Sequence, residues 1–298
     1  IVDDLNRFQN VRSARFVDWT GDGRSVYVST RFGDVAQLHR VDMPGGTRRQ
    51  LTFFDEPVRS ADRRPGGREL VFAMDRGGSE FDQLYLFDPA TGTTRLLTDG
   101  ESRNGQALWD HQGQQVAWQS TRRNGRSLDI WLMNPNDPGA ARLVLESQDG
   151  SAWAPADFSR DGTLLLVQNY VSSTESSVHL VDLSSGDRRV LAGGSGRQVR
   201  NYAVTIDPTA EGFYYVTDAG REYTALVYQR FDNGATPELI TEGIDWDVTS
   251  VVFSEDGSRA AFTVNEGGLS ALYLLDPVTR TRERVTGLPT GVAGGLAF

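Results

Sequence analysis

The sequence has no cysteine and no lysine among its 298 residues. Without cysteine the chain has no disulfide bond, no thiolate nucleophile and no cysteine-ligated metal. This absence is compatible with a reducing or an oxidising compartment; we expect the cytoplasm, with the periplasm as the alternative. All 30 basic residues are arginine, which a GC-rich coding sequence explains more simply than selection of every guanidinium group.

The chain is also poor in net positive charge and in long apolar runs. Its 40 acidic residues outnumber the basic ones and give a formal net charge of −10. Nucleic acids and anionic membrane surfaces bind clustered positive charge, and a membrane-spanning helix needs about 20 consecutive apolar residues. We therefore expect neither nucleic acid nor membrane as a partner.

What the sequence does contain is a repeat, of which residues 251–286 are the clearest copy. An apolar run ending at Phe253 leads into an acidic-glycine turn, and a second apolar run covers residues 260–264. A glycine loop precedes the alternating run 271–275, and a last short strand ends at Thr286. Four short strands joined by tight turns predict one antiparallel sheet, whose faces can be buried only if copies of the sheet stack.

Two markers repeat along the chain at the same interval. A glycine precedes the second strand of each copy at spacings of 44, 46, 49, 50 and 45 residues. An Asp or Asn ends the third strand at spacings of 46, 46, 48, 50 and 44 residues. The two sets are Gly23, Gly67, Gly113, Gly162, Gly212 and Gly257, and Asp42, Asp88, Asn134, Asp182, Asp232 and Asp276.

This period is typical of the four-stranded blade of a β-propeller. We therefore predict an all-β fold, a β-propeller of four-stranded antiparallel blades with six complete blades and the first strand of a seventh. The expected blades cover residues 16–52, 58–98, 105–145, 153–191, 201–241 and 248–286.

The two ends of the chain fall outside the six copies. Residues 1–15 are a polar lead-in that we expect to be extended or to form a short helix, and residues 16–298 form the propeller. Phe298 lies 45 residues after Phe253, so residues 291–298 are predicted to be the opening strand of the seventh blade. We therefore expect this chain to be part of a longer polypeptide.

Blade two differs from the other copies at the end of its first strand. Arg63 takes the slot that elsewhere holds an aromatic or aliphatic residue, such as Trp19 or Phe253. An unpaired charge in a channel-lining strand is costly. We expect Arg63 to be solvated and paired, with Asp62 as the candidate partner.

No self-sufficient active site is visible in the sequence. It lacks the Gly-x-Ser-x-Gly nucleophile elbow, the P-loop and the dinucleotide fingerprint. Its three histidines, His39, His111 and His179, fall at positions that the repeat explains, so we expect structural roles and no metal site. The acidic-glycine turns are interpreted as hairpin turns and not as calcium loops. We predict no catalytic residue and no cofactor in this chain.

The repeat, with its Asp-Gly turns and Leu-Thr ends, resembles the TolB-like propeller repeat. More closely, the chain resembles the N-terminal propeller of bacterial prolyl oligopeptidase-family serine peptidases, in the acylaminoacyl and dipeptidyl peptidase-like branch. This resemblance covers essentially the whole chain. The segments that carry it are residues 50–54, 75–78, 83–86, 220–223, 245–248 and 264–268.

The resemblance implies a seventh blade and, after Phe298, an α/β-hydrolase domain with a Ser-Asp-His triad as the partner of the propeller. In that family the propeller caps the active site, excludes large folded substrates and contributes polar side chains that bind peptide termini. Dipeptidyl peptidases use an arginine between the second and third strands of blade two, and Arg76 falls at the matching place. They also use a Glu-Glu pair before blade four; residues 146–150 lack it, which disfavours strict dipeptide release.

The candidate residues for binding a substrate or the hydrolase domain are Arg76, Glu80, Arg221 and Glu222, on two loops that join second and third strands. The simpler alternative is that they are solvated charges in surface ion pairs, worth at most about 1 kcal/mol each.

Two hypotheses for the whole chain remain. The leading one is a non-catalytic propeller that gates peptide substrates and helps to orient them for a serine peptidase domain. The alternative is a free-standing TolB-like propeller that acts as a protein-binding scaffold, a common use of this fold.

Overall fold

The computed structural model describes residues 1–9, 12–194, 196, 198–232 and 234–298. The chain separates into two compact units, Ile1–Gly105 and Gln106–Phe298. Its strands form six four-stranded sheets, each with its strands in chain order. Among the described residues, no helix has the length and the apolar character needed to cross a membrane.

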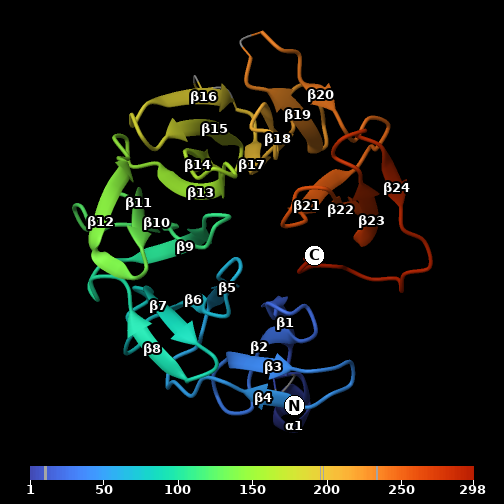
Figure 1. Cartoon of the computed structure of the whole chain (residues 1–298). Helices are drawn as coiled ribbons and strands as arrows, with labels where there is room; N and C mark the ends of the chain where they lie inside the picture. Colours follow the sequence, from blue (N-terminus) through green and yellow to red (C-terminus); the bar gives the residue numbers. More distant parts are fainter. Residues whose placement is uncertain (10–11, 195, 197, 233) are drawn as a thin grey trace. The chain divides into compact units, whose positions relative to one another are not determined.

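The first unit contains α1 (Val2–Gln9) and two complete sheets (Figure 1). The lead-in thus forms a short helix, the second of its two expected conformations; residues 10 and 11 lie outside the described residues. The strands of the two sheets are β1 (Ala14–Trp19), β2 (Val26–Thr30), β3 (Gln37–Val41) and β4 (Arg48–Gln50), then β5 (Ser60–Arg63), β6 (Leu70–Met74), β7 (Gln83–Asp88) and β8 (Thr93–Leu96).

Four further sheets follow along the chain (Figure 1). The third comprises β9 (Asn104–Trp109), β10 (Val116–Ser120), β11 (Asp129–Asn134) and β12 (Asp137–Leu145), and the fourth β13 (Ala152–Phe158), β14 (Leu164–Ser172), β15 (Glu175–Asp182) and β16 (Arg188–Ala192). The fifth comprises β17 (Asn201–Ile206), β18 (Gly212–Thr217), β19 (Ala225–Arg230) and β20 (Glu238–Leu239), and the sixth β21 (Asp247–Phe253), β22 (Ala260–Glu266), β23 (Leu269–Leu275) and β24 (Arg282–Arg284).

These six antiparallel sheets are the blades of a β-propeller, the fold class that the repeat predicts. Each sheet begins and ends within two residues of the range expected from the two markers. The last strand of blade six, β24, ends at Arg284 and not at Thr286. Its hydrogen bonding continues one residue further, because the Val285 N–H donates to the Leu272 carbonyl oxygen at 2.9 Å.

The acidic-glycine turns between first and second strands are closed by their own side chains. In three blades the hydroxyl of Thr20, Ser159 or Ser254 donates to the aspartate two residues later at 2.6 Å. In the last of these turns the bond from Ser254 and further hydrogen bonds lower the pKa of Asp256 to about 2. Gly257 follows with a φ of 71°, which glycine adopts at little cost. The carboxylates therefore serve the turns themselves, as the hairpin interpretation requires.

The Leu-Thr ends of the repeat also have a structural role. In three blades the threonine follows the fourth strand, and its Oγ1 accepts the N–H of a leucine in the third strand at 3.0 to 3.1 Å. The hydroxyl satisfies a backbone donor after the strand ladder has ended. The pairs are Leu38 with Thr52, Leu84 with Thr98, and Leu226 with Thr241.

The hydrophobic cores lie between neighbouring sheets of the same unit. In the first unit Leu38 of β3 and Phe72 of β6 belong to one buried cluster. In the second unit Leu226 of β19 and Phe262 of β22 belong to another. Burying one such side chain contributes about 1.5 to 3 kcal/mol, so stacking stabilises sheets that could not bury both faces alone.

The prediction that Asp62 pairs with Arg63 was wrong. Its Nε lies 3.6 Å from the carboxylate of Asp18 and donates to the carbonyl oxygen of Trp19 at 2.9 Å. Both partners belong to blade one. Adjacent residues of a strand point to opposite faces of the sheet, so Asp62 and Arg63 do not face each other. The charge of Arg63 is therefore paired with the neighbouring blade.

Residues 291–298 form no strand. The Ser270 N–H donates to the carbonyl oxygen of Gly291, and the Ala293 N–H donates to the hydroxyl of Ser270, both at 2.9 Å. These bonds hold the segment at the start of β23. Its assignment to a seventh blade stays a prediction.

Candidate functional site: two strand-linking loops and a cavity

The loop between β6 and β7 is built around the buried carboxylate of Asp75. This residue follows the last residue of β6 and is 1% exposed. Its Oδ2 accepts the N–H of Glu80 at 3.0 Å, across a loop in which Glu80 itself has a φ of 60°. Such a conformation is uncommon for a residue other than glycine. The bond fixes the loop and leaves the side chains between its ends outside the core.

Arg76 lies on this loop, and its guanidinium group has no partner among the residues that the structure describes. The side chain is exposed and makes no ion pair or side-chain hydrogen bond with any residue that the structure describes. It borders a hollow of about 480 Å³ in the first unit, together with Phe81, Gln83 and Glu101. Glu80 is also exposed and has no side-chain partner among the described residues. The structure thus brings Arg76 and Glu80 together on one loop, with both charges available.

A second arginine stabilises the base of the same loop. Arg59 precedes β5, and its Nε lies 3.0 Å from Asp82, while its terminal nitrogen lies 3.6 Å from Asp75. Burial raises the pKa of Asp82, and the attraction of Arg59 only partly opposes this. The Oδ1 atom of Asp75 is buried and has no hydrogen-bond partner in the described part of the chain. Arg59 therefore balances two carboxylates.

The loop between β18 and β19 presents the other predicted pair. Arg221 and Glu222 are both exposed, and neither side chain has a hydrogen bond or ion pair with the described residues. The backbone N–H of Arg221 donates to the Asp218 carbonyl oxygen at 3.0 Å, which closes the turn. Tyr223 then packs near Trp246, with ring centroids 5.9 Å apart. Arg221 and Glu222 are neighbours on this loop, in the second unit.

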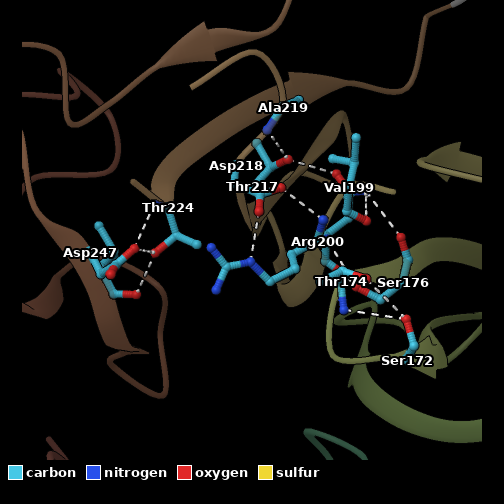
Figure 2. A network of polar contacts seen from close by, with 12 residues as sticks. Ser172, Thr174, Ser176, Val199, Arg200, Thr217, Asp218, Ala219, Thr224 and Asp247 are labelled. Atoms are coloured by element: carbon cyan, nitrogen blue, oxygen red, sulfur yellow. Dashed lines mark hydrogen bonds and ion pairs between the residues drawn. The ribbon is translucent and has the colours of Figure 1, made fainter. Parts of the chain in front are cut away.

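The sequence did not single out the arginine beneath this second loop. Arg200 precedes β17, and its Nε donates to Asp218 at 2.7 Å, while its backbone N–H donates to the same carboxylate at 2.8 Å (Figure 2). The bond to Asp218 raises the pKa of Arg200, so the guanidinium remains charged. Asp218 thus anchors one edge of the guanidinium group and leaves its two terminal amino groups to face away.

Arg200, whose terminal amino groups face away from Asp218, lines a cavity of about 610 Å³ in the second unit. These amino groups point toward Thr224 and Asp247 (Figure 2). Asp247 is the first residue of β21, and its Oδ1 accepts the backbone N–H of Thr224 at 2.8 Å and the hydroxyl of Thr224 at 3.0 Å. Val216 and Val248 contribute apolar surface to the same cavity. The cavity therefore combines fixed opposite charges with an apolar wall.

Arg200, Asp218 and Asp247 are functional candidates that sequence reasoning missed. One signal was available: an arginine directly precedes the first strand, and an aspartate directly follows the second, in blades two and five alike. The pairs are Arg59 with Asp75 and Arg200 with Asp218.

The histidines take part in local contacts. The Nε2 of His111 lies 2.9 Å from the Phe158 carbonyl oxygen and 3.1 Å from the Asp157 carboxylate. His39 and His179 are buried in third strands, and burial lowers the pKa of His179 to about 4. In the described part of the chain, no three residues of metal-ligating type are grouped so that they could hold an ion.

Comparison with known proteins places this fold. No protein-family model matches the chain. Among curated proteins, the Tol-Pal system protein TolB of Francisella tularensis strain WY96-3418 is 22% identical over 212 residues, which cover 70% of this chain and 46% of TolB. A second strain of that organism, FSC147, gives the same figures. The chain thus spans about half the length of the curated relatives it matches.

Several solved structures share the architecture. A prolyl endopeptidase superposes with a TM-score of 0.72 at 15% identity, covering 94% of this chain and 44% of the other. A Mycobacterium tuberculosis puromycin-hydrolyzing peptidase gives 0.72 at 16% identity, covering 93% and 47%. TolB from Acinetobacter baumannii gives 0.58 at 15% identity, covering 93% and 65%. The chain therefore has the β-propeller fold of these prolyl oligopeptidase-type peptidases and of TolB.

Proposed function

We propose that this propeller is the non-catalytic part of a serine peptidase, which gates peptide substrates and helps to orient them for an α/β-hydrolase domain of the same protein. The shared fold supports this proposal, because two of the similar structures are peptidases of which this chain covers less than half. The catalytic groups would then lie in the rest of the protein, since the described residues suggest no nucleophile of their own.

The observation that carries the proposal is the state of Arg76. Many charged side chains on a protein surface form weak ion pairs, and others lie on segments with no fixed conformation. Arg76 has no ionic partner among the described residues, yet its loop is fixed at the buried carboxylate of Asp75. An exposed guanidinium group on a loop with a fixed backbone can donate two parallel hydrogen bonds to a carboxylate, or bind a peptide carbonyl oxygen.

Glu80 adds a second recognition element on the same loop. Glu80 is exposed and lies in the chain between Ser79 and Phe81, two residues that line the same hollow as Arg76. A peptide could place a carbonyl oxygen on the guanidinium group, a donor on the carboxylate and an apolar side chain on the aromatic ring. Arg221 and Glu222 offer the same pair of charges on the loop of blade five.

The test uses the complete product of the gene and short chromogenic peptides. Arg76→Ala should raise KM about tenfold, the loss of one charge-assisted hydrogen bond, with a smaller change in kcat. Thermal unfolding should not change, because the side chain is exposed and unpaired. Arg24→Ala is the matched control, because Arg24 is an exposed arginine on the turn between β1 and β2. An unchanged KM for Arg76→Ala would remove its substrate role.

The second candidate function is a free-standing scaffold that binds protein partners. The observation that favours it is that the curated relatives matched by sequence are TolB proteins. The two functions differ in the complete gene product: a scaffold has no peptidase activity, and the Arg76 substitution would then affect only the binding of a partner protein.

A further inference from the structure

The cavity beside Arg200 offers a donor group that no described residue of the chain binds. The guanidinium side chain is 32% exposed, and Asp218 takes only its Nε edge. Neither terminal amino group has a hydrogen bond or ion pair with a residue that the structure describes. Figure 2 shows both of them directed toward the side on which Thr224 and Asp247 lie. Asp218 holds the Nε edge of the guanidinium group. The two terminal amino groups form a planar pair of N–H donors that matches the two oxygens of a carboxylate.

Asp247 offers the complementary acceptor. Thr224 binds only its Oδ1, through the backbone N–H and the hydroxyl. Its Oδ2 has no hydrogen bond or ion pair within the described part of the chain. Both Arg200 and Asp247 line the same cavity, and the negative charge of Asp247 helps to raise the pKa of Arg200, after the larger effect of the hydrogen bond to Asp218. The cavity therefore presents a fixed positive and a fixed negative group to one ligand.

The charges decide which class of ligand fits. Arg200, Asp218 and Asp247 together carry a net charge of about −1 when all are ionised. A simple anion on Arg200 would be repelled by Asp247, and a simple cation on Asp247 would be repelled by Arg200. A neutral molecule that carries both charges close together is attracted at both ends.

Part of the remaining cavity wall is apolar and favours a ligand with an aliphatic side chain. Val216, Val248 and Val251 line the cavity, and two of these, Val216 and Val248, belong to the buried core between blades five and six. This wall is rigid and apolar, so an aliphatic side chain of the ligand would lose water on contact with it. A volume of about 610 Å³ is in the usual range for a small-molecule site.

We propose that this cavity binds a free α-amino acid with an aliphatic side chain. The ligand carboxylate accepts hydrogen bonds from the two terminal amino groups of Arg200. Its ammonium group donates to the free carboxylate oxygen of Asp247, and its side chain lies on the valines. The site does not depend on the proposed peptidase function, because every group that forms it belongs to this chain.

The test is calorimetric titration of the chain with L-leucine and three relatives that each lack one feature. N-acetyl-L-leucine has no ammonium group, L-leucinamide has no carboxylate, and glycine has no aliphatic side chain. L-leucine should bind with a saturable isotherm. Each of the two derivatives should bind about tenfold to a hundredfold more weakly, the loss of a hydrogen-bonded charge, and glycine should also bind more weakly.

Two substitutions locate the binding. Asp247→Asn keeps an oxygen for Thr224 but removes the charge, and Arg200→Lys keeps the charge but removes the planar pair of N–H donors. Each should weaken L-leucine binding at least tenfold. Asp245→Asn is the control, because Asp245 is exposed and does not line the cavity. Thermal unfolding checks that each variant is folded. If Arg200→Lys is not folded, the binding of L-leucine by Asp247→Asn tests the site.

Three results would overturn the proposal. One is the absence of saturable L-leucine binding to the unmodified chain. Another is equal affinity for L-leucine, its N-acetyl derivative and its amide. The third is unchanged L-leucine binding by folded Asp247→Asn. None of these results bears on whether the complete gene product hydrolyses peptides, so a failure here and a failure of the proposed function can be told apart.

Discussion

Blades two and five each have an arginine before the first strand and an aspartate after the second, but the contacts of the arginine differ between the two blades. In blade two, Arg59 contacts Asp75 at 3.6 Å and a second carboxylate, Asp82, at 3.0 Å. In blade five, Arg200 contacts one carboxylate, Asp218, at 2.7 Å. The first arginine is therefore shared between two acids, while the second is anchored by one and keeps its terminal amino groups for a ligand.

A single position accounts for this difference. Met74 pairs with Gln83 across blade two, and Thr217 pairs with Ala225 across blade five. The residues that directly precede these third strands, Asp82 and Thr224, are therefore equivalent in register. In blade two, Asp82 at this position forms an ion pair with Arg59. In blade five, Thr224 at this position donates hydrogen bonds to Asp247 of the next blade instead. One substitution within a repeat can thus convert a structural ion pair into an open site.

The largest expected effect separates the two aspartates. Asp218→Ala removes two short hydrogen bonds to Arg200 at a partly buried position, and should lower the free energy of unfolding by about 2 to 3 kcal/mol. Asp75→Ala removes one hydrogen bond to the Glu80 N–H and the longer contact to Arg59, which keeps Asp82 as its partner. It also removes an oxygen that is buried without a hydrogen-bond partner among the described residues, so it should cost only about 1 kcal/mol. Urea unfolding of both variants measures the difference, and equal costs would show that the two pairs are energetically alike.

A smaller effect tests what the two blades share. Thr241→Val leaves the N–H of Leu226 without its acceptor, and should cost about 1 to 2 kcal/mol of unfolding free energy. Thr98→Val should cost slightly more, because the Thr98 hydroxyl also donates to Gln83 at 2.7 Å. Thermal and urea unfolding would check the order. A negligible cost in both blades would mean that the Leu-Thr ends do not support the strands.

The smallest expected effect is the pH dependence that Asp82 brings to blade two. Burial raises the pKa of its carboxyl group in the folded chain above the ordinary value of 3.8. The folded state therefore holds the proton more tightly than the unfolded state, and the contribution of Asp82 to the free energy of unfolding falls as pH rises between these two pKa values. Asp82→Asn should remove this slope.

The measurement is urea unfolding of both proteins at a series of pH values. The variant should gain stability relative to the unmodified chain as pH rises from below 3.8, until the folded-state pKa is passed. A difference that stays constant over this range would contradict the assignment. Blade five has Thr224 at the equivalent position and should contribute no such slope.

Most of the fold could be predicted from the sequence, but only part of the candidate site could. The period of the turn glycines and strand-ending aspartates predicted six four-stranded sheets because each repeat carries its own turn chemistry, as in the turn at Asp256. Arg76 was predicted as a site residue through a resemblance between loops, and its role stays a prediction. Arg200 was not predicted, because the role proposed for it depends on Asp218, which follows another strand, and on Asp247, 47 residues later. Periodicity predicts what blades have in common, whereas a site arises where one blade departs from the others.

Arg63 illustrates the same limit. Its place in the repeat was correctly identified as unusual, yet its neighbour Asp62 was expected as the partner. The alternation of side chains along a strand directs Arg63 to Asp18 of the neighbouring blade instead. Partners that come from another repeat depend on how sheets stack, and the spacing of residues along one chain does not contain that information.

The most direct test of the proposed function compares two proteins in one assay. The chain of 298 residues and the complete product of its gene are each incubated with aminoacyl and acyl-aminoacyl chromogenic peptides. We expect the complete product to hydrolyse these peptides and the chain alone to be inactive. Hydrolysis by the chain alone, or no hydrolysis by the complete product, would contradict the assignment of this propeller to a serine peptidase.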